Sequence, residues 1–177
     1  NTSQNIMDIL KKAENDMYLN KLLESKNTRS AIIISLENTL WDRTSETREH
    51  TERMQRIALR MAAGMGMRKH DADKLMLLAK LHDIGKIGIP GDVLRKPSSL
   101  LPEEWDAVKK HSEIGYRIVN ASPELSIIAE EILSHHERWN GQGYPRGLKG
   151  DEIPQLARII SIIDAYDVMT HETPYKL

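Results

Sequence analysis

The chain has 177 residues with 25 Lys and Arg against 26 Asp and Glu, which gives a formal net charge of -1. This length can bury one sizeable core, and the balanced charge gives no electrostatic basis for binding duplex nucleic acid or a membrane surface. Because cysteine is absent, disulfides and thiolate metal ligands are excluded, so a metal would be bound by histidine, carboxylate and water.

The amino end has no signal-peptide core, and no apolar run approaches the roughly 20 residues of a membrane span. We therefore expect a cytoplasmic chain whose own residues make no membrane contact. The sequence starts at Asn1 without Met and stops at Leu177. We expect it to be a piece of a longer protein.

Apolar residues repeat at helical spacing through most of the chain, and strand signals are almost absent, so the sequence predicts an all-α fold. Residues 1–41 are expected to form a long helical linker. A second helix is expected over 44–61, ending near two glycines, and a third over 71–85.

A Gly-, Pro- and Ser-rich loop is expected over 87–100, followed by a helix over 102–118 that Pro opens. A further helix is expected over 123–136. The glycines of 139–151 predict a loop, and Pro154 predicts the start of a last helix.

Five polar residues each fall on the apolar stripe of a different predicted helix: His50, His82, His111, His136 and Asp164. One buried histidine is readily explained as a hydrogen-bonded core residue. Five polar side chains that point inward together need a shared partner, because an unsatisfied buried polar group costs several kcal/mol. A metal cluster is the simplest such partner.

The run His82-Asp83-Ile84-Gly85-Lys86, the pair His135-His136 and the run Gly143-Tyr144-Pro145 occur in this order. Together they resemble the HD-GYP family of cyclic-dinucleotide phosphodiesterases, over roughly residues 42 to 176. The resemblance implies an HD-domain, PDEase-like helical bundle over 42–177 that lacks its last helices. A shorter stretch, residues 9–18, resembles the closing helix of GGDEF domains, which implies that 1–41 is the remnant of an upstream GGDEF domain.

The resemblance also implies a metal site of two or three divalent ions, chosen among Fe, Mn, Zn, Ni and Co. Its implied ligands are Glu46, His50, His82, Asp83, His111, His135, His136 and Asp164. Glu46 lies four residues before His50, so the two share a helix face. The alternative for Glu46 is a solvated residue in an acidic first turn, with Glu49 as a competing candidate.

Lys86 and Asp83 are the implied catalytic residues, with the Lys86 ammonium near the scissile phosphate. The alternative for Lys86 is an exposed lysine at a helix end. Substrate contacts are implied for a further set: Lys86, Gly143, Tyr144, Pro145, Arg146 and Lys176. Arg146 can equally be a surface residue.

The resemblance implies a bacterial signalling enzyme that hydrolyses cyclic di-GMP to linear pGpG and onward to GMP. The implied partners are a GGDEF domain, in the parent chain or in trans, and a second copy that pairs through the N-terminal helix. Thr173 stands where the family has Arg, which removes a bidentate phosphate clamp. The alternatives are therefore a phosphodiesterase for another cyclic dinucleotide or nucleotide, and a non-catalytic nucleotide-binding or interaction module.

Overall fold

A computed structural model describes residues 17, 30–44 and 47–171. The chain divides into two compact units, Asn1–Ser35 and Leu36–Leu177, so the expected domain boundary at residue 42 falls inside the second unit. The expected GGDEF-like stretch lies outside the described residues, except for Met17. Among the described residues, none of the helices has both the length and the apolar character to cross a bilayer.

The second unit is built from helices joined by short turns, and the described residues contain no strand, only one isolated bridge between Asn140 and Lys149. The prediction of an all-α fold is therefore confirmed. Residues 36–43 are helical. The later α-helices are α2 (Arg48–Gly64), α3 (Lys69–Leu81), α4 (Gly91–Leu94), α5 (Pro102–Lys109), α6 (His111–Asn120), α7 (Ala129–Ser134) and α8 (Gln155–Thr170). The 3₁₀ turns are η1 (Ile84–Gly88), η2 (Ser126–Ile128) and η3 (Gly150–Glu152).

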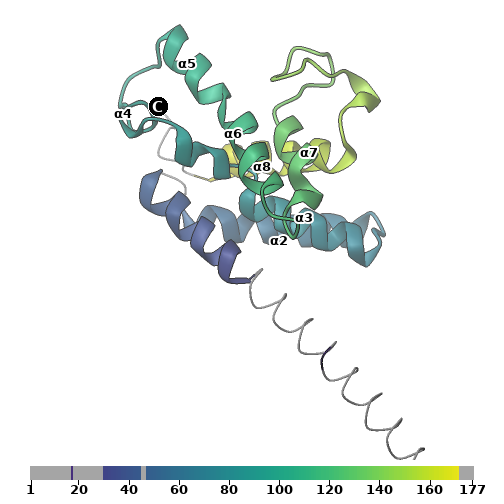
Figure 1. Cartoon of the computed structure of the whole chain (residues 1–177). Helices are drawn as coiled ribbons and strands as arrows, with labels where there is room; N and C mark the ends of the chain where they lie inside the picture. The colour runs from purple at the N-terminus through teal and green to yellow at the C-terminus, as the bar shows by residue number, and fades with distance from the viewer. Residues whose placement is uncertain (1–16, 18–29, 45–46, 172–177) are drawn as a thin grey trace, which may run out of the picture. The chain divides into compact units, whose positions relative to one another are not determined.

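Helices α2 and α3 lie at the bottom of this unit in Figure 1, with α6, α7 and α8 above them. Helix α8 contacts α2, α3 and α7, and α6 packs on η1 and α7. Helix α2 is capped by Thr47, whose hydroxyl accepts a hydrogen bond from the backbone N–H of His50 at 3.1 Å. The buried face of α2 repeats every four residues through Met54, Ala58 and Ala62. This spacing places one apolar stripe against α3 and α8, which supply fully buried leucine and isoleucine side chains.

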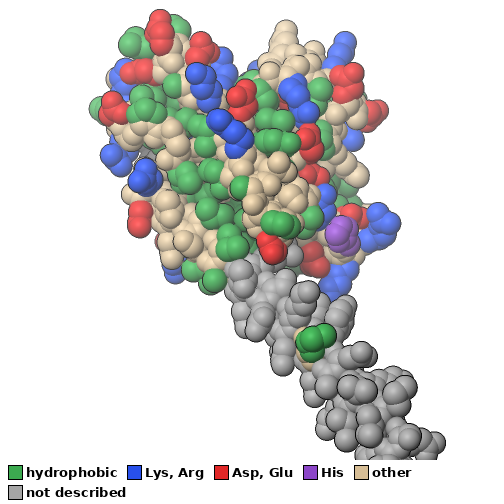
Figure 2. Space-filling view, viewed as in Figure 1, with side chains coloured by type: hydrophobic (Ala, Val, Ile, Leu, Met, Phe, Trp, Pro, Cys, Tyr) green, Lys and Arg blue, Asp and Glu red, His purple; other side chains and the backbone are tan. Residues whose placement is uncertain are grey.

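A smaller apolar cluster supports α4 and α5 at one end of the unit. Its buried members are Ile89, Leu94 and Val108, and Val93, Leu100 and Ile114 pack against it. The segment 139–150 stands at the opposite side of the same end (Figure 1). Lysine and arginine are interspersed with acidic residues on the face that Figure 2 shows, in agreement with the near-zero net charge.

Four expected boundaries were wrong. The helix expected over 71–85 ends at Leu81, and the 3₁₀ turn η1 begins at Ile84. The helix expected over 102–118 is two helices, because the Lys110 N–H bonds to Ala107, a three-residue spacing that tightens the turn before α6 begins. The helix expected over 123–136 contains only η2 and α7, which ends at Ser134. The loop expected over 87–100 contains the short helix α4, which starts directly after Pro90.

Gly85 permits the closest approach between two elements of this unit. A Cβ on Gly85 would overlap the backbone carbonyl oxygen of His111 and would lie 2.7 Å from the carbonyl carbon of that residue. Backbone atoms cannot move aside as a flexible side chain can. The glycine therefore allows η1 to lie directly on the first turn of α6.

We predict that Gly85→Ala lowers the free energy of unfolding by about 3 kcal/mol, the upper end of the range for overpacking. Gly64→Ala is the matched control, because nothing lies within 4 Å of a Cβ at that position. That control should be neutral or stabilising by about 0.5 kcal/mol, since alanine favours helix. Urea unfolding of both variants tests this, and equal stabilities would contradict the close approach.

Candidate metal centre

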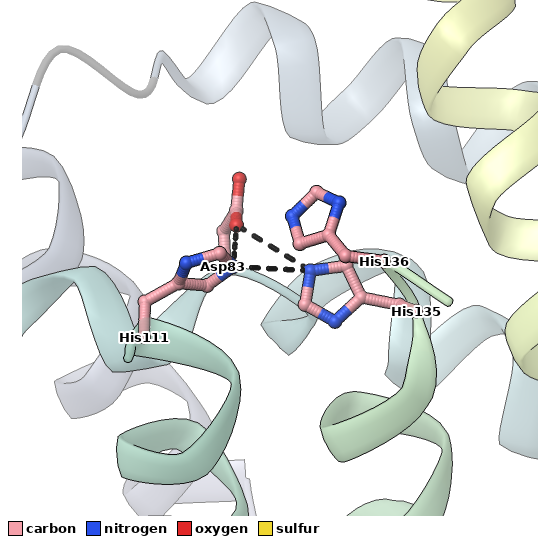
Figure 3. Close-up of side chains that lie close together, drawn as sticks. All are labelled: Asp83, His111, His135 and His136. Carbon is pink, nitrogen blue, oxygen red and sulfur yellow. Dashed lines mark hydrogen bonds and ion pairs between the residues drawn. The ribbon is translucent and has the colours of Figure 1, made fainter. Parts of the chain in front are cut away.

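Asp83, His111, His135 and His136 place one ligand atom each within 4.8 Å of one another. Figure 3 shows the four side chains converging from three parts of the chain. Asp83 precedes η1, His111 is the first residue of α6, and the two adjacent histidines directly follow α7. The prediction of a helical stripe is confirmed for His111, which shares the buried face of α6 with Gly115 and Val119. It was wrong for His136, which lies after the end of α7.

The protonation of two of these histidines follows from their backbone partners. His111 Nδ1 lies 2.7 Å from the carbonyl oxygen of Val108, and His135 Nδ1 lies 2.6 Å from that of Ile132. A carbonyl oxygen can only accept, so each Nδ1 carries the hydrogen and each Nε2 presents a lone pair. The two Nε2 atoms face each other at 3.2 Å. Only a cation between them, a proton or a metal ion, removes the repulsion.

The donor set fits a metal ion. With metal–nitrogen bonds of about 2.0–2.1 Å, two nitrogen ligands lie about 2.9 Å apart at a right angle and about 3.4 Å apart at the tetrahedral angle. The observed 3.2 Å falls between these values. The buried Asp83 Oδ1 accepts no hydrogen bond and lies 3.3 Å from His111 Nε2. A cation would satisfy that oxygen as well, so these residues can hold a divalent ion.

Charge and burial keep Asp83 ionised and His111 and His136 neutral, which are the protonation states that bind a metal. Burial alone would raise the pKa of Asp83, but the Lys86 ammonium, 2.7 Å away, and the neighbouring imidazoles outweigh it and hold that pKa well below its usual range. Burial lowers the pKa of His111 to about 4 and that of His136 well below its ordinary value. Asp83 is therefore anionic and both histidines are neutral at pH 7.

A second group, His50, His82 and Asp164, also has ligand atoms within 4.8 Å of one another. His50 Nε2 lies 3.8 Å from Asp164 Oδ1. His82 Nε2 lies 3.4 Å from Asp83 Oδ2, so Asp83 stands between the two groups. This arrangement can hold a second ion beside the first.

Asp167 orients the second group, a role that the sequence analysis did not predict. Its side chain is fully buried and lies 2.8 Å from His50 Nδ1. Arg53 donates two hydrogen bonds to the same carboxylate, at 2.7 and 2.8 Å. Because the Nδ1 hydrogen of His50 is committed to this carboxylate, its Nε2 is the ligand atom, as in carboxylate–histidine–metal arrangements. The spacing of Asp164 and Asp167 on one helix was the available signal.

Glu137 holds the loop after His136, and it too was missed. Its buried carboxylate accepts hydrogen bonds from the backbone N–H of Arg146 at 2.7 Å and of Leu148 at 3.0 Å. A Cβ on Gly143 would collide with backbone atoms of Glu137 and Arg138, so only glycine fits there. No sequence pattern distinguishes this glutamate from a surface residue.

The remaining predicted site residues fall into three groups. Tyr144 stacks on His136, with ring centroids 4.8 Å apart, and burial raises the pKa of its phenol. Pro145 follows Tyr144 through a cis peptide bond. The Arg146 guanidinium donates to Ser134 at 2.7 Å and pairs with Glu130 at 3.0 Å. Glu46, Thr173 and Lys176 lie outside the described residues.

Comparison with known proteins identifies the family of this chain. The HD domain family matches residues 35–177, and the chain belongs to that family. A cyclic di-GMP phosphodiesterase of Thermotoga maritima is 48% identical over 136 residues, 76% of this chain and 37% of the relative. A 3'3'-cGAMP-specific phosphodiesterase of Vibrio cholerae is 36% identical over 160 residues, 89% of this chain and 31% of the relative.

A cyclic di-GMP phosphodiesterase response regulator of Xanthomonas campestris is 38% identical over 136 residues, which is 76% of this chain and 36% of the relative. The chain thus spans about a third of the length of these curated relatives. The family assignment made from the sequence motifs is confirmed. The comparisons do not bear on the GGDEF-like lead-in.

We predict that Asp167→Asn lowers the free energy of unfolding by about 3 kcal/mol, since it leaves the partly buried Arg53 without its counter-ion. Asp151→Asn is the matched control, because Asp151 pairs with Arg158 at 2.8 Å but its side chain is 88% exposed. The control should lose less than about 1 kcal/mol. Denaturant unfolding measures both losses, and losses of equal size would mean that the buried pair does not stabilise the fold.

Proposed function

We propose that this HD domain is a metal-dependent phosphodiesterase that hydrolyses a cyclic dinucleotide, with cyclic di-GMP as the first candidate. The observation that carries the proposal is the pair of facing Nε2 atoms of His111 and His135 beside the buried Asp83 carboxylate. The substrate class is supported by the names of the Thermotoga and Xanthomonas relatives. A second candidate substrate is 3'3'-cGAMP, which the name of the Vibrio relative supports.

In this proposal Asp83, His111, His135 and His136 would hold a first ion, and His50, His82 and Asp164 would hold a second. A third ion would require Glu46 beside His50. The donors are nitrogen and oxygen atoms, which suits Fe, Mn, Zn, Ni or Co. Because no cysteine is present to supply a thiolate, the donor atoms do not select one of these metals over the others.

Divalent ions, when bound here, supply a Lewis acid and a nucleophilic oxygen at neutral pH. The chain's own residues do the rest. Carbonyl acceptors fix the ring orientation of His111 and His135, and Asp167 fixes that of His50. The Lys86 Nζ, 2.7 Å from Asp83 Oδ2, carries positive charge beside the position of the phosphate and stabilises negative charge that develops on its oxygens.

The loop that carries Tyr144 would contact the sugar or base of the substrate, because that ring lies stacked on His136 at the edge of the site. Gly143 and Pro145 shape this loop. Arg146 and Lys176 remain proposed substrate contacts. The proposed products are linear pGpG and then GMP, and the proposed setting is bacterial cytoplasmic signalling with a GGDEF domain as partner and pairing through the N-terminal helix.

Metal analysis followed by turnover of cyclic di-GMP and 3'3'-cGAMP under reducing conditions tests the proposal. We expect at least two ions per chain and hydrolysis of one or both dinucleotides. A metal-replete protein that binds either dinucleotide and never cleaves it would contradict the enzymatic function. It would support the non-catalytic alternative.

We predict that Asp83→Ala removes bound metal and abolishes hydrolysis while the helical content stays largely intact. Asp106→Ala is the matched control, because Asp106 also pairs with a lysine three residues later, at 2.6 Å, but on the exposed surface. The control should keep full metal content and activity. Elemental analysis, circular dichroism and product chromatography measure these outcomes, and an unchanged metal count in Asp83→Ala would remove Asp83 from the site.

We predict that Lys86→Gln lowers kcat by about 100- to 1,000-fold, the range for loss of one group that stabilises transition-state charge. Metal content should be unchanged, because an ammonium group cannot coordinate metal. Lys109→Gln, which alters an exposed i,i+3 pair, should leave kcat unaltered. Equal kcat values for the Lys86 variant and the parent would show that Lys86 only balances the charge of Asp83.

A further inference from the structure

A cavity of about 400 Å³ lies beside the metal centre, between η1 and the segment from α4 to α5. Its walls include Lys86, Val93, Leu94, Leu100, Trp105 and Val108. The volume lies within the range of pockets for small organic ligands. Hydrophobic side chains are visible on the lobe that carries α4 and α5, at the upper left of Figure 2.

Two residues belong both to this cavity and to the surroundings of the metal centre. Lys86 lines the cavity, and its Nζ lies 2.7 Å from Asp83 Oδ2. Val108 lines it as well, and its carbonyl accepts the Nδ1 hydrogen bond of His111 at 2.7 Å. A ligand bound in the cavity would therefore contact Lys86 and Val108, each of which contacts a candidate metal ligand. The cavity adjoins the proposed active site through these two residues.

The walls of the cavity are held in place before any ligand binds. Leu94 and Val108 belong to the small apolar cluster and are buried. Lys96 on the rim pairs with Glu104 at 2.6 Å, and the same carboxylate accepts the backbone N–H of Leu101 at 2.7 Å. These contacts fasten the 96–101 segment to the first turn of α5. A preformed pocket binds its ligand without a large ordering penalty.

The chemistry of the walls selects a flat, largely apolar group with a polar edge. Trp105 lines the cavity and is 48% exposed, so its indole is accessible to a ligand there. Ser98 and Ser99 line the rim and offer hydroxyl donors and acceptors, and no carboxylate lines the cavity. A purine base has two π-faces and a hydrogen-bonding edge, which these groups match.

We propose that this cavity is a nucleobase subsite, which receives one purine of the cyclic dinucleotide while the adjoining phosphodiester lies at Lys86 and the metal centre. The inference rests on the proposed function and adds the position of one base. Trp105 stacks on the base, and the 96–100 segment contacts its edge. This segment then becomes a determinant of which purine is accepted.

Steady-state kinetics of the metal-loaded chain on cyclic di-GMP tests the subsite. Trp105→Ala should lower kcat/KM by about 5- to 100-fold, as expected for loss of one base–aromatic stack. Trp105→Phe should restore much of the loss. Leu101→Ala is the matched control, because Leu101 is an exposed apolar residue of the same lobe that does not line the cavity. Its kcat/KM and the metal content of all three variants should equal those of the parent.

The chain has three tryptophans, so their indole N–H signals provide a direct second readout. Addition of cyclic di-GMP should shift the Trp105 signal, whereas that of Trp139, which lies over Arg158, should not move. An active parent with unchanged kcat/KM in Trp105→Ala would overturn the subsite and leave the proposed function standing. A parent that cleaves no dinucleotide would overturn the proposed function. In that case the indole N–H signal of Trp105 still tests the subsite. An unchanged Trp105 signal at saturating dinucleotide would overturn the subsite.

Discussion

Two imidazoles face each other through their Nε2 atoms at the centre of this domain, beside a buried carboxylate. In a dry interior this arrangement is unfavourable, because each unsatisfied polar atom retains its full desolvation penalty. A bound cation converts the same atoms into a coordination shell. The elements that meet there, η1, α6 and the end of α7, are arranged as if around that cation.

The fold positions these groups with backbone atoms more than with side chains. His111 and His135 each donate to a carbonyl three residues earlier, and His82 Nδ1 lies 3.4 Å from the Ala79 carbonyl in the same relation. Placing each histidine at a helix end makes this possible, since the last carbonyls of a helix have no intrahelical partner. At His50 the Nδ1 partner is instead the Asp167 carboxylate, which accepts a hydrogen bond from Arg53.

The sequence predicted the helical class, the family and the residues that converge, because these depend on periodicity and on short motifs. It did not predict the break at Lys110, where a backbone hydrogen bond to Ala107 tightens the turn, or the end of α7 at Ser134. Asp167 and Glu137 were missed as well. Their importance lies in what they touch, and a carboxylate in a helix or after a histidine pair has no distinctive local pattern.

Anomalous diffraction from crystals of the purified protein, collected at the absorption edge of its metal, tests the central claim most directly. The account predicts a peak in contact with His111 Nε2, His135 Nε2 and an oxygen of Asp83, with both Nδ1 atoms still bonded to their carbonyls. A map without a peak at this position, or a metal bound through Nδ1 of a rotated ring, would contradict it.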